Sequence, residues 1–313
     1  MRHVASGTRS RTRCPLKLKA IADAGFDAVE LSMPDILAYG KMLNGSEPDP
    51  KDYDALVEIS QAIKAQMVEH NLKVMMLQPF ANFEGWPRGS TEREDAFDRA
   101  RGWIRVMEAV GTDLLQVGSS DAPGIADSSV DDMAADLAEL ADLCAAKGFR
   151  VAYENWCWAM RAPSWKDVWD IVKRADRPNL GLCLDTFQSG GGEAQVEQRW
   201  SESLAELVVT VPASKIFLLQ ISDAYKMDPP LADEVDKESG LRPRGQWSHD
   251  YRPLPYDGGY LPVREFLNAV LDTGFRGYLS MEVFDPKGQE KRYPDMGAYA
   301  KKAMDSLEKL LVA

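Results

Sequence analysis

The chain has 313 residues, of which 45% are apolar and 27% charged, enough for a large buried core beneath a charged surface. Its formal net charge of −12 argues against nucleic acids and anionic membranes as partners, because both are bound by basic surfaces. No apolar run approaches the length of a membrane span, so we expect no membrane partner.

The first 22 residues depart from this acidity, because they carry six basic residues and no acidic one: Arg2, Arg9, Arg11, Arg13, Lys17 and Lys19. A segment of this kind is compatible with an organellar transit peptide. We favour a second interpretation, in which it supplies a first strand, a loop and the start of a helix that belongs to the fold.

The four cysteines form no CxxC pair and no disulfide framework: Cys14, Cys144, Cys157 and Cys183. We expect free thiols that pack as small apolar side chains, and therefore a reducing compartment, the cytoplasm. Only three histidines are present, which excludes a site built from several imidazoles.

Strands and helices are predicted to alternate from one end of the chain to the other. The expected strands cover residues 3–7, 26–32, 73–80, 113–118, 149–154, 180–185, 215–221 and 277–282. The expected helices cover residues 16–24, 51–70, 91–110, 129–147, 164–174, 200–210, 262–271 and 297–311. The central strands are apolar without alternation, which is typical of parallel strands covered on both faces. Eight such units favour a closed (β/α)8 TIM barrel, formed as a single domain over residues 1–313.

Two connections between these elements bear on function. The strand that ends at Asp185 is followed by the run SGGGE at 189–193, which we expect to be a glycine-rich loop. The long insertion 223–260 follows the strand that ends near Gln220, and we interpret it as a lid over the mouth of the barrel. No GxGxxG follows the first strand and no GxxxxGK[ST] occurs, so nucleotide binding has no support from motifs.

Polar side chains stand at the carboxyl ends of the predicted strands, where TIM barrels carry their active sites. They are Glu30, Gln78, Gln116, Glu154, Asp185, Gln220 and Glu282. Carboxylates that converge on one mouth repel each other unless a cation or protons compensate their charge. An all-oxygen set of Glu154, Asp185, Gln220 and Glu282 suits a hard divalent ion such as Mg²⁺ or Mn²⁺.

These same segments carry a resemblance to a known family. YENWCW, LGLCLDTFQ, KIFLLQISDA, GGYLPV and YLSMEVF are similar to the xylose isomerase-like barrels of sugar phosphate isomerases and epimerases. More closely they resemble the fungal-type 3-dehydroshikimate dehydratases of quinate and shikimate catabolism, and the likeness includes LQPF at 77–80 and WSHDYR in the insertion. The resemblance implies a divalent cofactor (Mg²⁺, Mn²⁺ or Co²⁺) at Glu154, Asp185, Gln220 and Glu282.

The resemblance also implies a reaction, in which 3-dehydroshikimate loses water to give protocatechuate through an enediolate that the metal stabilises. A carboxylate substrate needs a cation, for which Arg244 and Arg252 of the insertion are candidates. His249 is a candidate proton relay, with Glu154 and Glu282 beside the reacting atoms. Further substrate contacts are expected from Glu30, Gln78, Gln188 and Trp156. Asp223 is expected to orient Gln220, and His70 to cap a helix.

Departures from the family pattern leave the proton-transfer base open. Related bacterial enzymes carry a histidine two residues after the first metal-binding glutamate, where this chain has Trp156, and Gln188 stands where many relatives have another histidine. The alternative within enzymes is a sugar (phosphate) isomerase or ketose epimerase on the same metal barrel. The alternative of another class is a non-catalytic small-molecule-binding barrel. A DNA-repair endonuclease is disfavoured by the scarcity of histidines, and the resemblance is compatible with a homo-oligomer.

Overall fold

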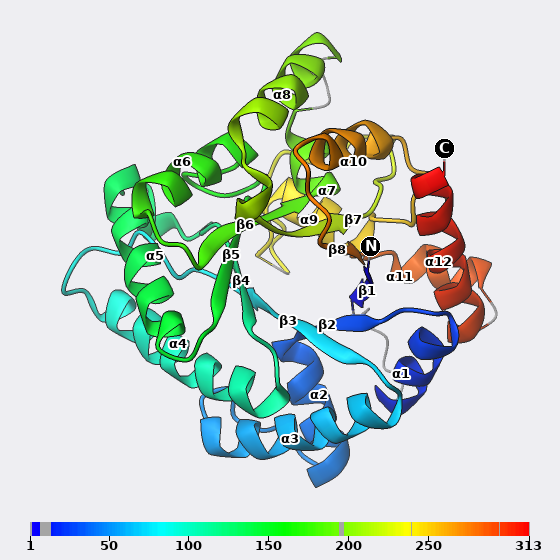
Figure 1. Ribbon diagram of the computed structural model, residues 1–313, viewed down its shortest axis with the longest axis horizontal. Helices are drawn as coiled ribbons and strands as arrows, with labels where there is room; N and C mark the ends of the chain where they lie inside the picture. The colour runs from blue at the N-terminus through cyan, green and yellow to red at the C-terminus, as the bar shows by residue number, and fades with distance from the viewer. Residues whose placement is uncertain (1, 7–13, 194–196, 239, 294, 313) are drawn as a thin grey trace.

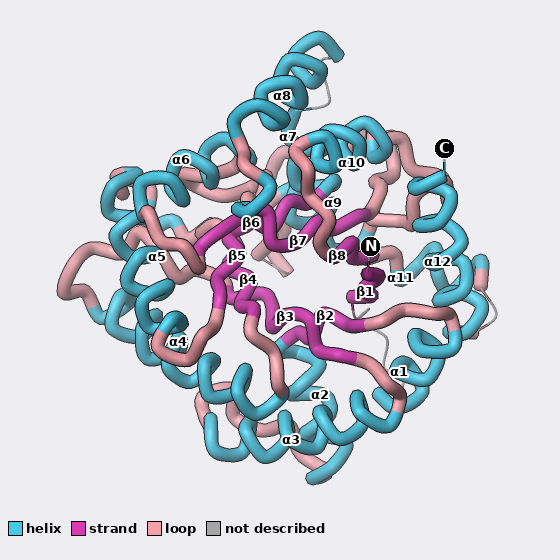
Figure 2. The backbone as a smooth tube through the Cα atoms, viewed as in Figure 1, coloured by secondary structure: helices cyan, strands magenta, loops and turns pink. Residues whose placement is uncertain are grey.

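The computed structural model describes residues 2–6, 14–193, 197–238, 240–293 and 295–312, and these form a closed barrel of eight parallel strands in sequential order. The strands are β1 (Arg2–Ser6), β2 (Ala28–Ser32), β3 (Lys73–Phe80), β4 (Leu114–Gly118), β5 (Arg150–Glu154), β6 (Leu180–Asp185), β7 (Ile216–Ile221) and β8 (Tyr278–Met281). Figure 1 shows them at the centre of the molecule, and Figure 2 shows the helices as a ring around them. The predicted (β/α)8 barrel is confirmed.

One helix in each strand–helix unit belongs to the outer ring. These helices are α1 (Cys14–Asp23), α3 (Tyr53–Glu69), α4 (Thr91–Val110), α5 (Val130–Ala145), α6 (Trp165–Ala175), α8 (Glu197–Thr210), α10 (Val263–Asp272) and α12 (Met296–Val312). Their apolar faces pack on the outward-facing side chains of the strands in one continuous core. No described helix is both long enough and apolar enough to cross a bilayer.

The first predicted strand is present, because β1 pairs with β2 through Val4 and Ala28 and with β8 through His3 and Leu279. The interpretation of the basic N-terminal segment as part of the fold is therefore confirmed for residues 2–6 and for α1. The remainder of the predicted loop, residues 7–13, lies outside the described residues.

Four short helices were not predicted: α2 (Met33–Asn44), α7 (Thr186–Glu193), α9 (Pro243–Asp250) and α11 (Pro286–Arg292). Two single 3-10 turns, η1 (Pro123–Ile125) and η2 (Ala213–Lys215), also join the larger elements. All four short helices follow strand ends, so they surround the mouth of the barrel rather than its floor. The inserted segment 223–260 is thus partly helical, through α9, rather than irregular throughout.

The expectation of a glycine-rich loop after Asp185 is wrong, because these residues form α7. The Asp185 carboxylate begins the helix: its Oδ1 accepts hydrogen bonds from the backbone N–H groups of Phe187 (2.5 Å) and Gln188 (3.0 Å). The glycines serve close packing instead of a turn. A Cβ on Gly191 would lie 3.1 Å from the ring of Trp247 on α9, so the absence of a side chain lets α9 approach α7.

A small second core fills the inside of the barrel. It is made of Ala28, Met75, Met76, Leu114, Ala152, Cys183 and Leu218. Because side chains alternate along a strand, the residue two positions after an inward-facing one also faces inward, one layer nearer the mouth. The inward-facing residues are therefore apolar at the floor of the barrel, and the next inward-facing layer, nearer the mouth, is polar.

Candidate metal centre

The inward-facing residues at the strand ends form a buried polar layer above the inner core. Ala152, Cys183 and Leu218 belong to the floor, and two residues later come Glu154, Asp185 and Gln220. Strand register sets these residues side by side, since Asp185 pairs with Gln220 across β6 and β7. The sequence pattern and the barrel geometry therefore bring the predicted ligands to one level.

Three carboxylates of this layer meet closely. One oxygen from each of Glu154, Asp185 and Glu282 lies within 4.8 Å of the others, and all three side chains are buried. Glu30 extends the group, because the Gln220 amide nitrogen donates both to Glu30 Oε2 (2.9 Å) and to Glu282 Oε1 (3.0 Å). Four acidic groups in a site shielded from water demand protons or a cation.

The pKa values of three glutamates in this layer are raised. Burial raises the pKa of Glu30 to about 7, and its hydrogen bonds to neighbouring side chains only partly oppose that rise. Burial, reinforced by the charge of Asp185, raises the pKa values of Glu154 and Glu282 well above the ordinary range, and the nearby Arg252 opposes this rise. In each case the protein disfavours an uncompensated negative charge.

Neutral amide groups hold oxygens of the glutamates in this layer. Glu154 Oε2 accepts a hydrogen bond from the Gln116 amide, whereas its Oε1 has no hydrogen-bond partner among the described residues. Gln78 donates to Glu30 Oε2 at 3.2 Å and to Glu282 Oε1 at 3.5 Å. These contacts orient the glutamates, and one oxygen from each of the three gathered carboxylates lies near the others, as an oxygen-ligated divalent ion requires. The donor set fits the predicted metal.

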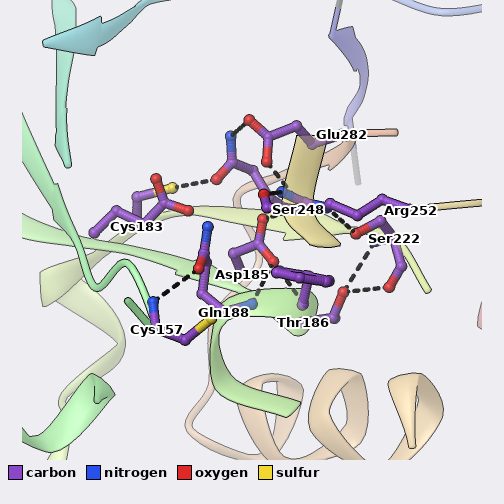
Figure 3. Close-up of polar contacts among 12 residues, drawn as sticks. Cys157, Cys183, Asp185, Thr186, Gln188, Ser222, Ser248, Arg252 and Glu282 are labelled. Atoms are coloured by element: carbon purple, nitrogen blue, oxygen red, sulfur yellow. Dashed lines mark hydrogen bonds and ion pairs between the residues drawn. The ribbon is translucent and has the colours of Figure 1, made fainter. Parts of the chain in front are cut away.

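Arg252 supplies the positive charge within this group (Figure 3). Its Nη2 lies 2.5 Å from Asp185 Oδ2 and 2.9 Å from Glu282 Oε2, and the side chain is 1% exposed. We expected Arg252 on the lid, as a partner of the substrate carboxylate. In the structure its backbone pairs with Phe284 beyond β8 and its guanidinium binds the protein's own carboxylates.

Gln220 presents its amide nitrogen, not its oxygen, to the carboxylates. The oxygen, Oε1, instead accepts a hydrogen bond from the Cys183 thiol at 2.9 Å. Metal ligation by Gln220 thus requires its amide to turn over, which exchanges the positions of nitrogen and oxygen. Its place as the fourth ligand remains a prediction, whereas Glu154, Asp185 and Glu282 are gathered by the fold itself.

The rim of the site is aromatic. The rings of Trp156 and Trp158 stack with centroids 5.2 Å apart, and the Trp156 ring covers Gly118, where a Cβ would lie 2.2 Å from it. Gln188 is buried beside them and accepts a hydrogen bond from the backbone N–H of Cys157 (3.0 Å). Arg244 donates to the carbonyl of Cys157 (3.2 Å) and is otherwise exposed. These residues lie near one another, and their contacts with substrate remain predictions.

Three further predictions have different outcomes. His249 lies on α9, next to Ser248 and partly buried, and its role in proton transfer remains a prediction. His70 is confirmed as a helix cap, since it ends α3 and its N–H donates to Gln66. Asp223 does not orient Gln220: its Oδ1 accepts hydrogen bonds from the backbone N–H groups of Ala224 and Leu261, so it shapes the loop. That expectation was wrong because it rested on nearness in sequence.

Sequence reasoning did not anticipate Ser222, Ser248 and Cys183. The two serines hold the guanidinium of Arg252, and Cys183 holds the oxygen of Gln220. Cys183 could have been found from the alternation of β6, because it lies two residues before Asp185. Ser248 offers no such signal, since it lies in the insertion.

Comparison with known proteins places these observations in context. A model of the family described as "Xylose isomerase-like TIM barrel" matches residues 18–310. A 3-dehydroshikimate dehydratase of Neurospora crassa is 30% identical over 298 residues, covering 88% of this chain and 82% of that protein. One of Pseudomonas aeruginosa is 34% identical over 285 residues, covering 91% of this chain, which spans only 38% of that longer relative. A solved xylose isomerase-like TIM barrel/4-hydroxyphenylpyruvate dioxygenase fusion protein superposes with a TM-score of 0.77 at 26% identity, covering 99% of this chain and 42% of the other.

Proposed function

The chain belongs to the xylose isomerase-like TIM-barrel family, and we propose that it is a metal-dependent 3-dehydroshikimate dehydratase. The reaction removes one water molecule from 3-dehydroshikimate and leaves the aromatic product protocatechuate. The observation that carries the proposal is the buried cluster of Glu154, Asp185 and Glu282 at the barrel mouth. The similarity to two named dehydratases over about nine-tenths of the chain supplies the substrate.

The cofactor in this proposal is a hard divalent ion, Mg²⁺, Mn²⁺ or Co²⁺, held by Glu154, Asp185 and Glu282, with Gln220 as fourth ligand after its amide turns. When bound, such an ion supplies positive charge that stabilises the negative charge developing on the substrate ketone as a neighbouring C–H bond breaks. The donor set supports this class, because the three gathered side chains, and Gln220 after its amide turns, all offer oxygen ligands.

The chain's own residues would bind and orient the substrate. Trp156 and Trp158 would form an apolar wall that excludes water from one side of the six-membered ring of the substrate. Gln78, in the buried layer, and Gln188, which is bound to the backbone of Cys157, are the candidate partners of the substrate hydroxyls. Arg244, exposed on α9, is available to the substrate carboxylate.

Proton transfer requires a group that changes its protonation state near neutral pH. Glu30 is a candidate, because it lies in the buried layer and its Oε1 has no hydrogen-bond partner among the described residues. His249 on α9 is the other candidate. A carboxylate that binds a metal ion does not also carry the proton of the reaction. We therefore assign Glu154 and Glu282 to metal binding and not to proton transfer. The buried, free thiols of Cys144, Cys157 and Cys183 support a reducing compartment such as the cytoplasm.

The decisive assay follows the product directly. Purified protein is incubated with 3-dehydroshikimate and each of Mg²⁺, Mn²⁺ and Co²⁺, and protocatechuate is measured by its ultraviolet absorbance. We expect product with at least one ion, and its loss in EDTA and in Glu154→Gln. A matched control is Glu84→Gln, which alters a buried carboxyl outside the cluster. Absence of protocatechuate with every ion, together with epimerisation of a ketose, would establish the sugar isomerase alternative. Ligand binding without turnover of either substrate class would establish the non-catalytic one.

A further inference from the structure

The guanidinium of Arg252 is held at several points inside the protein. Its Nε donates to Ser222 Oγ (2.9 Å) and its Nη1 to Ser248 Oγ (3.3 Å), as Figure 3 shows around these labelled residues. The rings of Phe187 and Phe284 flank it, with centroids 4.7 Å and 5.3 Å from Cζ. Among the described residues, the contacts of this guanidinium with carboxylates are made by Nη2. The anchoring half and the carboxylate-binding half of the group are thus separate.

The two oxygens bound by Nη2 are those that a divalent ion would need. Asp185 has its other oxygen, Oδ1, occupied by the two N–H groups at the start of α7. Glu282 has its other oxygen, Oε1, occupied by the amide of Gln220. Asp185 Oδ2 and Glu282 Oε2 therefore face the centre of the cluster, and both are within 2.9 Å of Arg252 Nη2.

We propose that Arg252 Nη2 and the divalent ion compete for Asp185 Oδ2 and Glu282 Oε2. An ion that binds both oxygens would stand within a few ångströms of a guanidinium nitrogen in a site shielded from water, where like charges repel strongly. Detachment of Nη2 breaks two buried ion pairs, a cost that the binding of the ion must offset. The contact of Nε with Ser222 and the two flanking rings keep the group in place as it turns. Released from the carboxylates, Nη2 becomes a donor for an anionic group of the substrate, so metal binding prepares carboxylate recognition.

This inference rests on the metal site of the proposed function, and titration calorimetry with Mn²⁺ tests it without any activity measurement. The variant is Arg252→Met, which keeps an unbranched chain and removes the charge. We expect its Mn²⁺ dissociation constant to fall by at least about tenfold, because the ion no longer displaces or faces a cation. Arg242→Met is the matched control, since Arg242 lies in the same segment but donates to the carbonyl of Trp158. Its Mn²⁺ affinity should match that of the parent protein.

An unchanged or weaker affinity in Arg252→Met would overturn the inference, because a residue that positions the carboxylates for the ion gives that result. If Arg252→Met does not fold, crystals of the parent protein grown with EDTA and then soaked in MnCl₂ answer the same question. We expect an anomalous Mn²⁺ peak and Nη2 withdrawn from Asp185 Oδ2 beyond about 3.5 Å, with Nε still on Ser222. Mn²⁺ bound with both Nη2 contacts intact refutes the competition alone. No Mn²⁺ binding by the parent protein refutes the proposed metal site as well.

Discussion

The substitution Glu154→Gln separates metal binding from folding, because it removes a ligand while improving the match of the side chain to its surroundings. Glu154 is buried, and burial together with the charge of Asp185 raises its pKa well above the ordinary range. Its Oε2 accepts a hydrogen bond from Gln116, and its Oε1 has no hydrogen-bond partner among the described residues. A glutamine can keep the first contact through its own oxygen and direct its NH₂ toward the carboxylates. Without metal, the variant should therefore be at least as stable as the parent.

When metal is bound, the parent should be more stable than Glu154→Gln. An ion at a hundred times its dissociation constant stabilises the folded parent by about 2.7 kcal/mol. An unfolding entropy of about 2.1 cal/mol/K per residue gives about 0.7 kcal/mol per kelvin for this chain, so the melting temperature should rise by about 4 °C. In Glu154→Gln the rise should be close to zero, because a neutral amide replaces one of three gathered carboxylates.

Differential scanning fluorimetry with and without Mn²⁺ measures both effects in one experiment. Glu84→Gln is the control, since Glu84 is as deeply buried but binds the backbone of Ser120 and the hydroxyl of Tyr153. It should retain the full metal-induced rise. A rise of about 4 °C in Glu154→Gln as well would refute the assignment of this carboxylate as a ligand.

Three further predictions concern the surroundings of the site. Burial raises the pKa of Glu84 to about 7, so the folded protein keeps this proton where the unfolded chain has lost it, and its stability falls as the pH rises from about 4.5 to 7. The variant Glu84→Gln does not titrate, so its unfolding free energy relative to the parent should increase by up to about 3 kcal/mol between pH 5 and 8, as measured by urea titration. Gly118→Ala places a Cβ 2.2 Å from the Trp156 ring and should cost about 1–3 kcal/mol of unfolding free energy, whereas Gly192→Ala, whose Cβ meets only Cys157 at 3.8 Å, should not. Arg244→Gln should raise KM for 3-dehydroshikimate about tenfold with little change in kcat, because Arg244 would bind the non-reacting carboxylate; an unchanged KM contradicts that role.

The barrel was predictable because its signal is repeated and physical. Strands buried on both faces are apolar without alternation, and the helices between them carry one apolar face each. The short helices around the mouth were missed for different reasons. For α2 a signal existed, because Ser32 caps it by accepting from Asp35 and a proline occupies its first turn. For α7 the local sequence predicts a loop, because it contains three consecutive glycines. The helix forms because Asp185 caps its first turn and Trp247 packs against Gly191.

The candidate site was also predictable only in part. The acidic residues at strand ends could be recognised because the barrel fixes where strand ends lie. The partners of those residues could not, because they depend on contacts between distant segments. Arg252 is 67 residues from Asp185, and only the fold shows that it enters the cluster rather than remaining on the surface of the insertion. Asp223 illustrates the converse, because closeness in sequence to Gln220 brought no contact with it.

The identity of the donors around the carboxylates has a consequence for metal binding. Gln78, Gln116 and Gln220 all donate amide N–H groups to the cluster, and an amide satisfies a carboxylate without adding positive charge. Lysines or arginines at those positions would neutralise the glutamates permanently and remove the electrostatic demand for an ion. Neutral donors keep the carboxylates oriented and leave that demand in place. Within the described part of the barrel mouth, the charged donor to these carboxylates is Arg252, which is the group that we propose the ion displaces.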